Sequence, residues 1–242
     1  MILIFGLYLN SKHLDKIDFS EYGLIFKRQS FVYLIIGVLI GTISVASMFF
    51  IGKTSGILLI SEVKTDSNNG LILLFALKML LVGILEETFF RGYLFTNIYK
   101  DVKSDRVTNR QGFLIALLVS SLLFGFAHIS TNNVSILSIT FLSINGIVWC
   151  IPFAITKNLG LSIGLHAAWN FTQTQLGFTM SGNKTTNPLY NIENNASTLL
   201  TGGEYGPEAG VLGLIGFTLM LMLSLGYLKL TRKIKRYNTI FD

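Results

Sequence analysis

Charged residues are scarce in this sequence, and their scarcity excludes an ordinary soluble protein. They make up 13% of the 242 residues, whereas about 25% is typical of a globular chain. Hydrophobic residues make up 51%, and the mean hydropathy is +0.58. This composition also excludes a disordered chain, because disordered chains are poor in apolar residues. The remaining class is an integral membrane protein, so long apolar runs should be present.

Cysteine is nearly absent, which excludes a fold stabilised by disulfides. Cys150 is the only one, and it lies in an apolar run without polar neighbours that could activate its thiol. We expect it to be an inert packing residue. A convincing cleavable signal peptide is also missing, since the apolar stretch 1–9 is short and lacks a basic region. Residues 1–30 are expected to form a cytoplasmic or truncated N-terminal segment.

Six apolar runs predict membrane-spanning helices, because about 20 apolar residues cross the hydrocarbon core of a bilayer. The alternation of apolar and polar residues that a membrane barrel requires does not appear. The predicted fold is therefore all-α: a polytopic bundle of about six transmembrane helices within residues 31–230. The predicted spans are Phe31–Ile51, Leu71–Ile98, Phe113–His128, Val134–Thr156, Leu159–Phe178 and Ala209–Leu230.

The basic residues of the predicted loops are distributed unequally between the two sides of the membrane. Of the 19 Lys and Arg residues, only Lys53, Lys64 and Lys184 fall in loops on one side, and Lys78 and Arg91 fall within a span. The others lie on the side that holds both termini and the basic tail, 231–242. Because cytoplasmic loops are enriched in Lys and Arg, we expect a multi-pass protein of the cell membrane with both termini in the cytoplasm. The net charge of +6 then reflects topology, and no nucleic acid partner is expected.

Charged side chains in the second predicted span indicate a structural or functional role, because placing them inside a bilayer costs free energy. Glu87 and Arg91 are four residues apart and can form an ion pair along one helix face. Glu86 is turned about 100° from that face and has no cation on its own helix. A carboxyl group without such a partner is suited to general acid–base chemistry. We therefore assign Glu86 to chemistry, and Glu87 and Arg91 mainly to structure.

Two further spans carry polar pairs at helical spacing. Phe124 and His128 are four residues apart at the end of the third span, and His166 and Asn170 are four residues apart in the fifth. An imidazole and an amide on one helix face can donate hydrogen bonds to a developing oxyanion. Taken singly, each pair could also serve only the packing of helices.

The ordered set of three motifs resembles the CPBP family, which contains CAAX prenyl proteases and membrane proteins associated with bacteriocin processing or immunity. The family pattern is Glu-Glu-x-x-x-Arg, then Phe-x-x-x-His, then His-x-x-x-Asn. This sequence matches all three parts, at residues 86–91, 124–128 and 166–170. The motifs define a core over residues 71–178. The turn-rich segment 202–208 is also similar to family members.

The resemblance implies an intramembrane endopeptidase that acts on a peptide or membrane-anchored protein. In the related prenyl-protein protease, the first Glu and the first His are thought to activate a water, and the second His and the Asn to stabilise the oxyanion. Carried over, Glu86 and His128 are the pair that activates water, and His166 and Asn170 form the oxyanion hole. The supporting residues are Glu87, Arg91 and Phe124.

The resemblance leaves open whether a metal takes part. Two His and one or two Glu can hold zinc with an open coordination position, and the candidate ligands are Glu86, Glu87, His128 and His166. Against zinc, the sequence has no His-Glu-x-x-His motif, and a glutamate alone can activate water. We favour a glutamic mechanism without a metal or other cofactor.

Non-enzymatic functions are the alternatives. The same constellation could serve as a binding site in a membrane scaffold or a bacteriocin self-immunity protein. A transporter with the Glu and His residues as a proton relay would show an inverted repeat, and none is evident.

Overall fold

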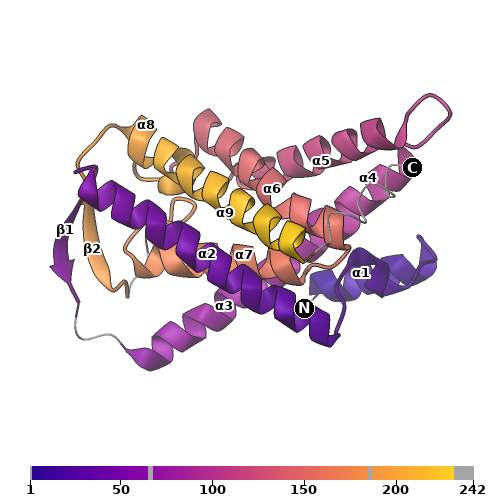
Figure 1. Ribbon diagram of the computed structural model, residues 1–242, viewed down its shortest axis with the longest axis horizontal. Helices are drawn as coiled ribbons and strands as arrows, with labels where there is room; N and C mark the ends of the chain where they lie inside the picture. Colours follow the sequence, from indigo (N-terminus) through magenta and orange to yellow (C-terminus); the bar gives the residue numbers. More distant parts are fainter. Residues whose placement is uncertain (1, 65–67, 185–186, 232–242) are drawn as a thin grey trace.

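Long helices packed into a bundle make up most of the protein in a computed structural model, which describes residues 2–64, 68–184 and 187–231 (Figure 1). The predicted tail 231–242 lies outside the described residues except for Thr231. The elements in chain order are α1 (Ile2–His13), the 3-10 turn η1 (Phe19–Tyr22), α2 (Arg28–Thr54), β1 (Leu58–Val63), α3 (Asn69–Glu87), the π-helical turn η2 (Thr88–Phe95), α4 (Thr96–Asp101), α5 (Asn109–Phe126), α6 (Ile136–Thr156), α7 (Gly160–Gln175), β2 (Tyr190–Asn194), α8 (Thr198–Thr201), the 3-10 turn η3 (Pro207–Ala209) and α9 (Val211–Leu230).

Five helical runs in the described part of the chain are long and apolar enough to cross a membrane, which confirms the predicted helical membrane fold. The run that contains α3 is the most open to the surroundings: only 11% of its most apolar stretch is buried, and Leu73, Leu74 and Leu81 are exposed. Such a continuous apolar surface is typical of contact with a membrane. The five runs are Arg28–Thr54, Asn69–Asp101, Asn109–Phe126, Ile136–Thr156 and Val211–Leu230.

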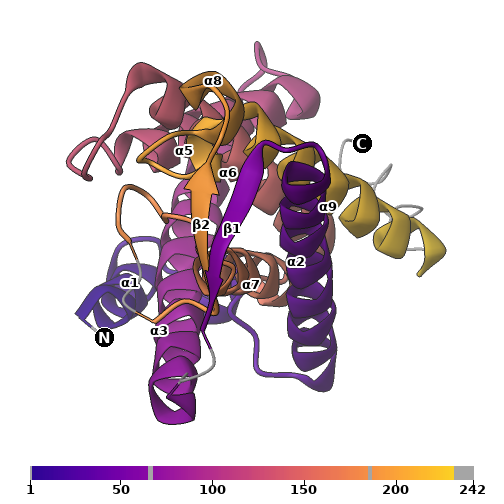
Figure 2. The same cartoon turned by 90° about the vertical axis from the view of Figure 1, so that its left-hand side faces the viewer.

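The predicted fifth span, Leu159–Phe178, differs from these five. Its helix, α7, has 16 residues and is therefore about 24 Å long, shorter than the roughly 30 Å hydrocarbon core of a bilayer. It lies between α2 and α3 (Figure 2), and almost every residue in it is buried. Burial inside the bundle suits this helix because His166, Asn170 and Gln173 are polar and would be costly against lipid.

Close backbone contact joins α7 to α2. A Cβ atom on Gly37 would lie 2.4 Å from the carbonyl oxygen of Leu161, and one on Gly41 would lie 2.9 Å from that of Leu165. Small residues allow membrane helices to approach in this way. Because the contacts advance along both helices together, α2 and α7 run in the same direction.

The neighbouring long helices run in alternating directions. Phe75 of α3 packs against Phe171 of α7 with ring centroids 6.3 Å apart, while Gly83, further along α3, approaches the carbonyl of Ile163 near the start of α7. These two helices are therefore antiparallel, as are α5 with α6 and α2 with α9. Helix α7 thus follows the direction expected of the fifth of six successive segments.

A two-stranded antiparallel sheet joins the connection after α2 to the connection after α7. Leu58 of β1 pairs with Asn194 of β2, and Val63 pairs with Tyr190. The sheet lies across one end of the bundle (Figures 1 and 2), which we call the sheet end. It was not predicted, because the strands are short and distant in sequence. Their pairing places both connections at the same end, as the predicted topology requires.

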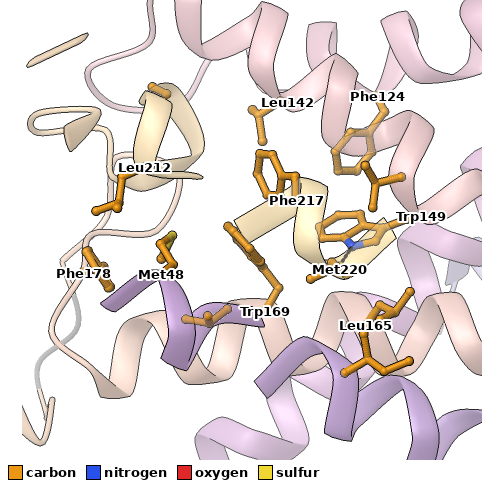
Figure 3. Packing of buried hydrophobic residues seen from close by; sticks show 14 of the residues in the cluster. Met48, Phe124, Leu142, Trp149, Leu165, Trp169, Phe178, Leu212, Phe217 and Met220 are labelled. Atoms are coloured by element: carbon orange, nitrogen blue, oxygen red, sulfur yellow. Dashed lines mark hydrogen bonds between the residues drawn. The ribbon is translucent and has the colours of Figure 1, made fainter. Parts of the chain in front are cut away.

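Aromatic side chains from several helices fill the centre of the bundle (Figure 3). Trp169 of α7 is fully buried and packs on Phe217 of α9, with ring centroids 4.3 Å apart. Trp149 of α6 donates its indole N–H to the sulfur of Met220 at 3.3 Å. Because indole groups are large and rigid, this core fixes α6, α7 and α9 relative to one another.

Candidate active site

The two adjacent glutamates lie where α3 changes into the π-helical turn η2. Glu86 and Glu87 are the last residues of α3, and Arg91 lies in the middle of η2. The predicted span Leu71–Ile98 lies within one helical run, Asn69–Asp101, in which residues 88–95 are π-helical. Thr88 stabilises the transition by donating its hydroxyl to the carbonyl oxygen of Ile84 at 2.6 Å. Short π-helical turns are frequent at functional sites.

Glu87 and Arg91 form a completely buried ion pair, as their spacing predicts. Arg91 Nη1 lies 3.0 Å from Glu87 Oε1, and Arg91 Nη2 donates to the carbonyl oxygen of Gly146 in α6 at 3.1 Å. The guanidinium also lies 4.4 Å from the ring centroid of Phe124 in α5. A buried charge requires such partners because its desolvation is costly. Arg91 thereby ties η2 to both α5 and α6.

Glu87 also holds the histidine of α7. Its Oε1 atom lies 2.8 Å from Nδ1 of His166. Because a carboxylate only accepts hydrogen bonds, Nδ1 must carry the hydrogen and donate it. The imidazole is stacked on the indole of Trp149, with centroids 3.9 Å apart and an interplanar angle of 16°. The tautomer and the ring orientation of His166 are therefore both fixed.

Glu86 faces the opposite nitrogen of the same histidine. Its Oε2 atom lies 3.9 Å from Nε2 of His166. The Glu86 side chain is 31% exposed, whereas that of Glu87 is fully buried. Glu86 Oε2 is itself buried and makes no hydrogen bond within the described residues. The missing partner on its own helix was expected, but the imidazole from α7 could not be found from spacing alone.

His128 lies just beyond the end of α5, not within the helix as predicted, because α5 ends at Phe126. Its Nδ1 atom lies 2.9 Å from the carbonyl oxygen of Phe124. A carbonyl oxygen only accepts, so Nδ1 donates, and Nε2 of the neutral ring carries the free lone pair. The rings of Phe124 and His128 are in contact, with centroids 5.0 Å apart. His128 is thus prepared to accept a proton through Nε2.

The residues to which the sequence assigns chemistry line one small cavity. Glu86, His128, His166 and Asn170 all contribute to its wall, and its volume is about 150 Å³. Asn170 lies one helical turn after His166 on α7. Because a water molecule occupies about 30 Å³ in the liquid, the cavity can hold a peptide group together with a water. The ion pair of Glu87 and Arg91 lies behind this wall, out of contact with solvent.

Six further residues line the cavity and were not predicted: Val82, Leu142, Trp149, Met180, Ser181 and Glu208. Trp149 lines it and stacks on His166. An aromatic residue within an apolar span is typical of a core, so no sequence signal distinguished it. Glu208 also lines the cavity, from the turn η3 that precedes α9. A glutamate directly before an apolar span was an available signal, but the segment 202–208 was interpreted as turn-rich and similar to family members, with no role for Glu208.

Glu208 connects three segments around the cavity. It is 2% exposed, and its Oε1 accepts a hydrogen bond from Gln173 Nε2 of α7 at 3.1 Å. Its Oε2 accepts two hydrogen bonds from Ser181, from the backbone N–H at 2.7 Å and from the hydroxyl at 2.9 Å. Hydrogen bonds to a charged acceptor are stronger than neutral ones. Glu208 therefore holds the wall segment around Ser181 in place.

The arrangement does not fit a zinc centre. Among the described residues, no group of three or more His, Cys, Asp or Glu side chains could hold a metal ion. The Nδ1 atoms of His128 and His166 are used in hydrogen bonds to Phe124 and Glu87, so only their Nε2 atoms are left as possible metal ligands. Glu87 Oε1 is shared between His166 and Arg91. Zinc sites in proteins need three or four converging protein ligands.

The fold and the cavity together define a class: polytopic helical membrane proteins that enclose an acid–imidazole site between their helices. Ionisable residues buried in such a bundle mark a functional site. Within that class, residues 68–172 match the family model described as type II CAAX prenyl endopeptidase Rce1-like. All three motifs fall inside the matched segment.

This match confirms the resemblance to CPBP-family intramembrane proteases. It implies protease activity in a membrane and a protein or peptide as substrate. Among curated proteins and solved structures, nothing matches the chain.

Proposed function

We propose that the protein is an intramembrane endopeptidase that hydrolyses a peptide bond of a membrane-associated protein or peptide. The observation that carries this proposal is the convergence of Glu86, His128, His166 and Asn170 on one cavity. They come from three separate segments of the chain, and chance placement of polar groups in a membrane bundle is disfavoured by its cost. The family match over residues 68–172 supports the same reaction class.

In the first step, Glu86 and His128 activate a water molecule. The carboxylate of Glu86 accepts a proton from water as the water oxygen attacks the carbonyl carbon of the substrate. His128 Nε2, left free by the bond from Nδ1 to Phe124, accepts a hydrogen bond from the same water and orients it. General bases positioned in this way contribute about 10²–10⁴-fold to the rate.

In the second step, the negative charge on the carbonyl oxygen is stabilised from α7. The Asn170 amide donates one hydrogen bond. His166 donates a second from Nε2 when its ring carries both protons, since Nδ1–H is already given to Glu87. The ion pair of Glu87 with Arg91 and the stacking on Trp149 hold the imidazole in position before the substrate binds. Preorganised donors of this kind typically contribute about 10²–10³-fold.

In the third step, the tetrahedral intermediate collapses and the peptide C–N bond breaks. The proton held by Glu86 passes to the departing nitrogen, which leaves as an amine. The oxygen from water stays in the new carboxyl group. Glu86 returns to the carboxylate, so the cycle consumes one water and needs no covalent intermediate or cofactor.

The proposal is tested by comparing peptide ends in membranes and medium of cells that carry wild type or Glu86→Gln at matched expression. The substitution keeps the shape of the side chain and removes the base. We expect at least one new N-terminus, with its matching C-terminus, in the wild type alone. Identical ends, with the variant inserted and folded, would refute the proposal and favour a scaffold or self-immunity function.

A further inference from the structure

Helices form much of the wall of the catalytic cavity, and the connections that contribute to it come from one end of the bundle. His128 follows α5, Met180 and Ser181 follow α7, and Glu208 precedes α9. Each of these connections lies at the sheet end, since β1 and β2 join the loops after α2 and α7 there. None of the cavity's lining residues comes from the connections at the opposite end, within the described residues.

Hydrogen bonds hold these connections together as one rim. The backbone N–H of Gly182 donates to the carbonyl oxygen of Tyr205 at 2.9 Å. The hydroxyl of Thr131 donates to the phenol oxygen of Tyr205 at 3.3 Å, and Asn132 Nδ2 donates to Asn183 Oδ1 at 3.3 Å. The loop after α5, the loop after α7 and the segment before α9 therefore surround the cavity on the same side.

A second, polar hollow adjoins this rim. It measures about 620 Å³ and is lined by the segment after α7, by β2 and by the segment 201–206. Thr179 and Gly206 line this hollow, while Ser181 and Glu208, two residues further along each segment, line the catalytic cavity. Hydroxyl, amide, charged and backbone groups dominate its lining, which suits a hydrated polypeptide better than lipid. The sheet end thus offers room for the polar part of a chain whose peptide bond enters the cavity.

The charges of the described residues differ between the two ends. The sheet end carries only three basic residues, Lys53, Lys64 and Lys184. The opposite end and the segments next to it carry Lys12, Lys16, Lys27, Arg28, Lys100, Lys103, Arg106, Arg110, Lys157 and Lys229. Cytoplasmic loops are enriched in Lys and Arg. This distribution places the sheet end on the side of the membrane away from the cytoplasm.

We propose that the catalytic cavity opens to the extracytoplasmic face, so that the substrates are exported peptides and the outer segments of membrane-anchored proteins. The position of the opening rests on the rim and the charges alone. The substrate class rests in addition on the proposed endopeptidase function. The proposal excludes cytoplasmic protein tails as substrates because none of the described residues in the connections at the opposite end lines the cavity.

The opening is tested by thiol labelling in intact cells, in a Cys150→Ala background. Met180→Cys and Ser181→Cys report on the cavity, Asn183→Cys on the exposed loop beside it, and Asp105→Cys on the loop between α4 and α5 at the opposite end. The probe is a small, charged, membrane-impermeant methanethiosulfonate. Each variant is checked for a single symmetric elution peak in detergent, and two cavity positions are used so that one misfolded variant does not decide the result.

We expect the cavity positions and Asn183→Cys to be labelled in intact cells, and Asp105→Cys only after the membrane is disrupted. The reverse pattern would overturn the proposal by placing the sheet end in the cytoplasm. Labelling of Asn183→Cys with both cavity positions silent before and after disruption would also overturn it, because the cavity would then not open to that face.

The substrate class is tested with a reporter protein that has one membrane anchor. The comparison of peptide ends identifies a segment that the protein cleaves, and one copy of this segment is placed on each side of the anchor. We expect the wild-type protein to cleave only the outer segment, and the Glu86→Gln variant to cleave neither segment. Cleavage of the inner segment would refute the substrate class. Absence of cleavage on both sides, with labelling as expected, would count against the endopeptidase function and leave the outward opening supported.

Discussion

One buried carboxylate, Glu87, organises the site at the scale of single residues. It accepts hydrogen bonds from Arg91 of η2 and from His166 of α7 through the same oxygen. A carboxylate shared in this way links the position of the imidazole to the ion pair behind it. Glu86, its neighbour in sequence, faces the cavity, and its Oε2 makes no hydrogen bond to any residue that the structure describes. The adjacent glutamates therefore have different tasks because successive residues of a helix point about 100° apart.

We predict that Glu87→Gln both destabilises the protein and abolishes activity. The substitution leaves the Arg91 guanidinium buried without a counter-charge, and removal of one partner of a buried ion pair typically costs about 3–5 kcal/mol. Adding Arg91→Met should restore much of the stability but none of the activity, because His166 is still not held. Thermal unfolding in detergent and the appearance of cleaved ends measure the two effects. Recovery of activity together with stability would show that Glu87 has no part in orienting His166.

Glu208 offers a second prediction at this scale. The backbone N–H and the hydroxyl of Ser181 both donate to the carboxylate of Glu208. Glu208→Gln replaces this charged acceptor with a neutral amide. Hydrogen bonds to a charged group contribute about 1.5–3 kcal/mol each. The cavity wall should loosen, and the cleavage rate should fall roughly tenfold, which corresponds to about 1.4 kcal/mol. The control is Glu21→Gln in η1, at the opposite end of the bundle, whose side chain is 54% exposed and which should cleave at the wild-type rate. Equal rates for both variants would argue against a positioning role for Glu208.

At the scale of elements, the contact between α2 and α7 decides where the site lies in the bundle. Helix α7 is too short and too polar to behave as an independent span, and it is stabilised by burial between its neighbours. Its glycines allow α2 to approach at backbone distance. This contact places His166 and Asn170 at the level of the last residues of α3, where Glu86 and Glu87 lie.

We predict that Gly164→Ala separates these helices. A Cβ atom at this position would lie 2.3 Å from the carbonyl oxygen of Leu34 and 2.9 Å from the Cα of Gly37, so the backbones must move apart. Overpacking of this kind costs about 1–3 kcal/mol, and a lower unfolding temperature with reduced cleavage should follow. Gly226→Ala in α9 is the control, because nothing lies within 4 Å of its Cβ position. Equal unfolding temperatures for the two variants would contradict the prediction that close contact between α2 and α7 stabilises the protein.

At the scale of the whole molecule, the apolar runs and the motif spacing were sufficient to predict a helical membrane protein and four of the residues that line the cavity. Glu86, His128, His166 and Asn170 could be selected because charge and polarity stand out in apolar spans. The residues that could not be predicted depend on tertiary contacts. The stacking of Trp149 on His166, the anchoring of Ser181 by Glu208 and the pairing of β1 with β2 join segments far apart in the chain.

The intact protein should contain no stoichiometric zinc. The described residues offer no cluster of three metal ligands, and Glu87, one of the four candidate ligands, already binds Arg91 and His166. We therefore expect cleavage to persist at the same rate in a zinc chelator, and elemental analysis of the purified protein to give far less than one zinc per chain. One zinc per chain that is lost on His128→Ala, with activity lost in chelator, would require a metal mechanism.

The most direct test of the central claim, that Glu86 activates the water that cleaves the substrate, is cleavage in ¹⁸O-labelled water. Membranes with wild type or Glu86→Gln are incubated in this water, and the new peptide C-termini are analysed by mass spectrometry. We predict one ¹⁸O atom in each new carboxyl group with the wild type, and a loss of product of about 10²–10⁴-fold with the variant. Labelled products formed at equal rates by both proteins would contradict the claim.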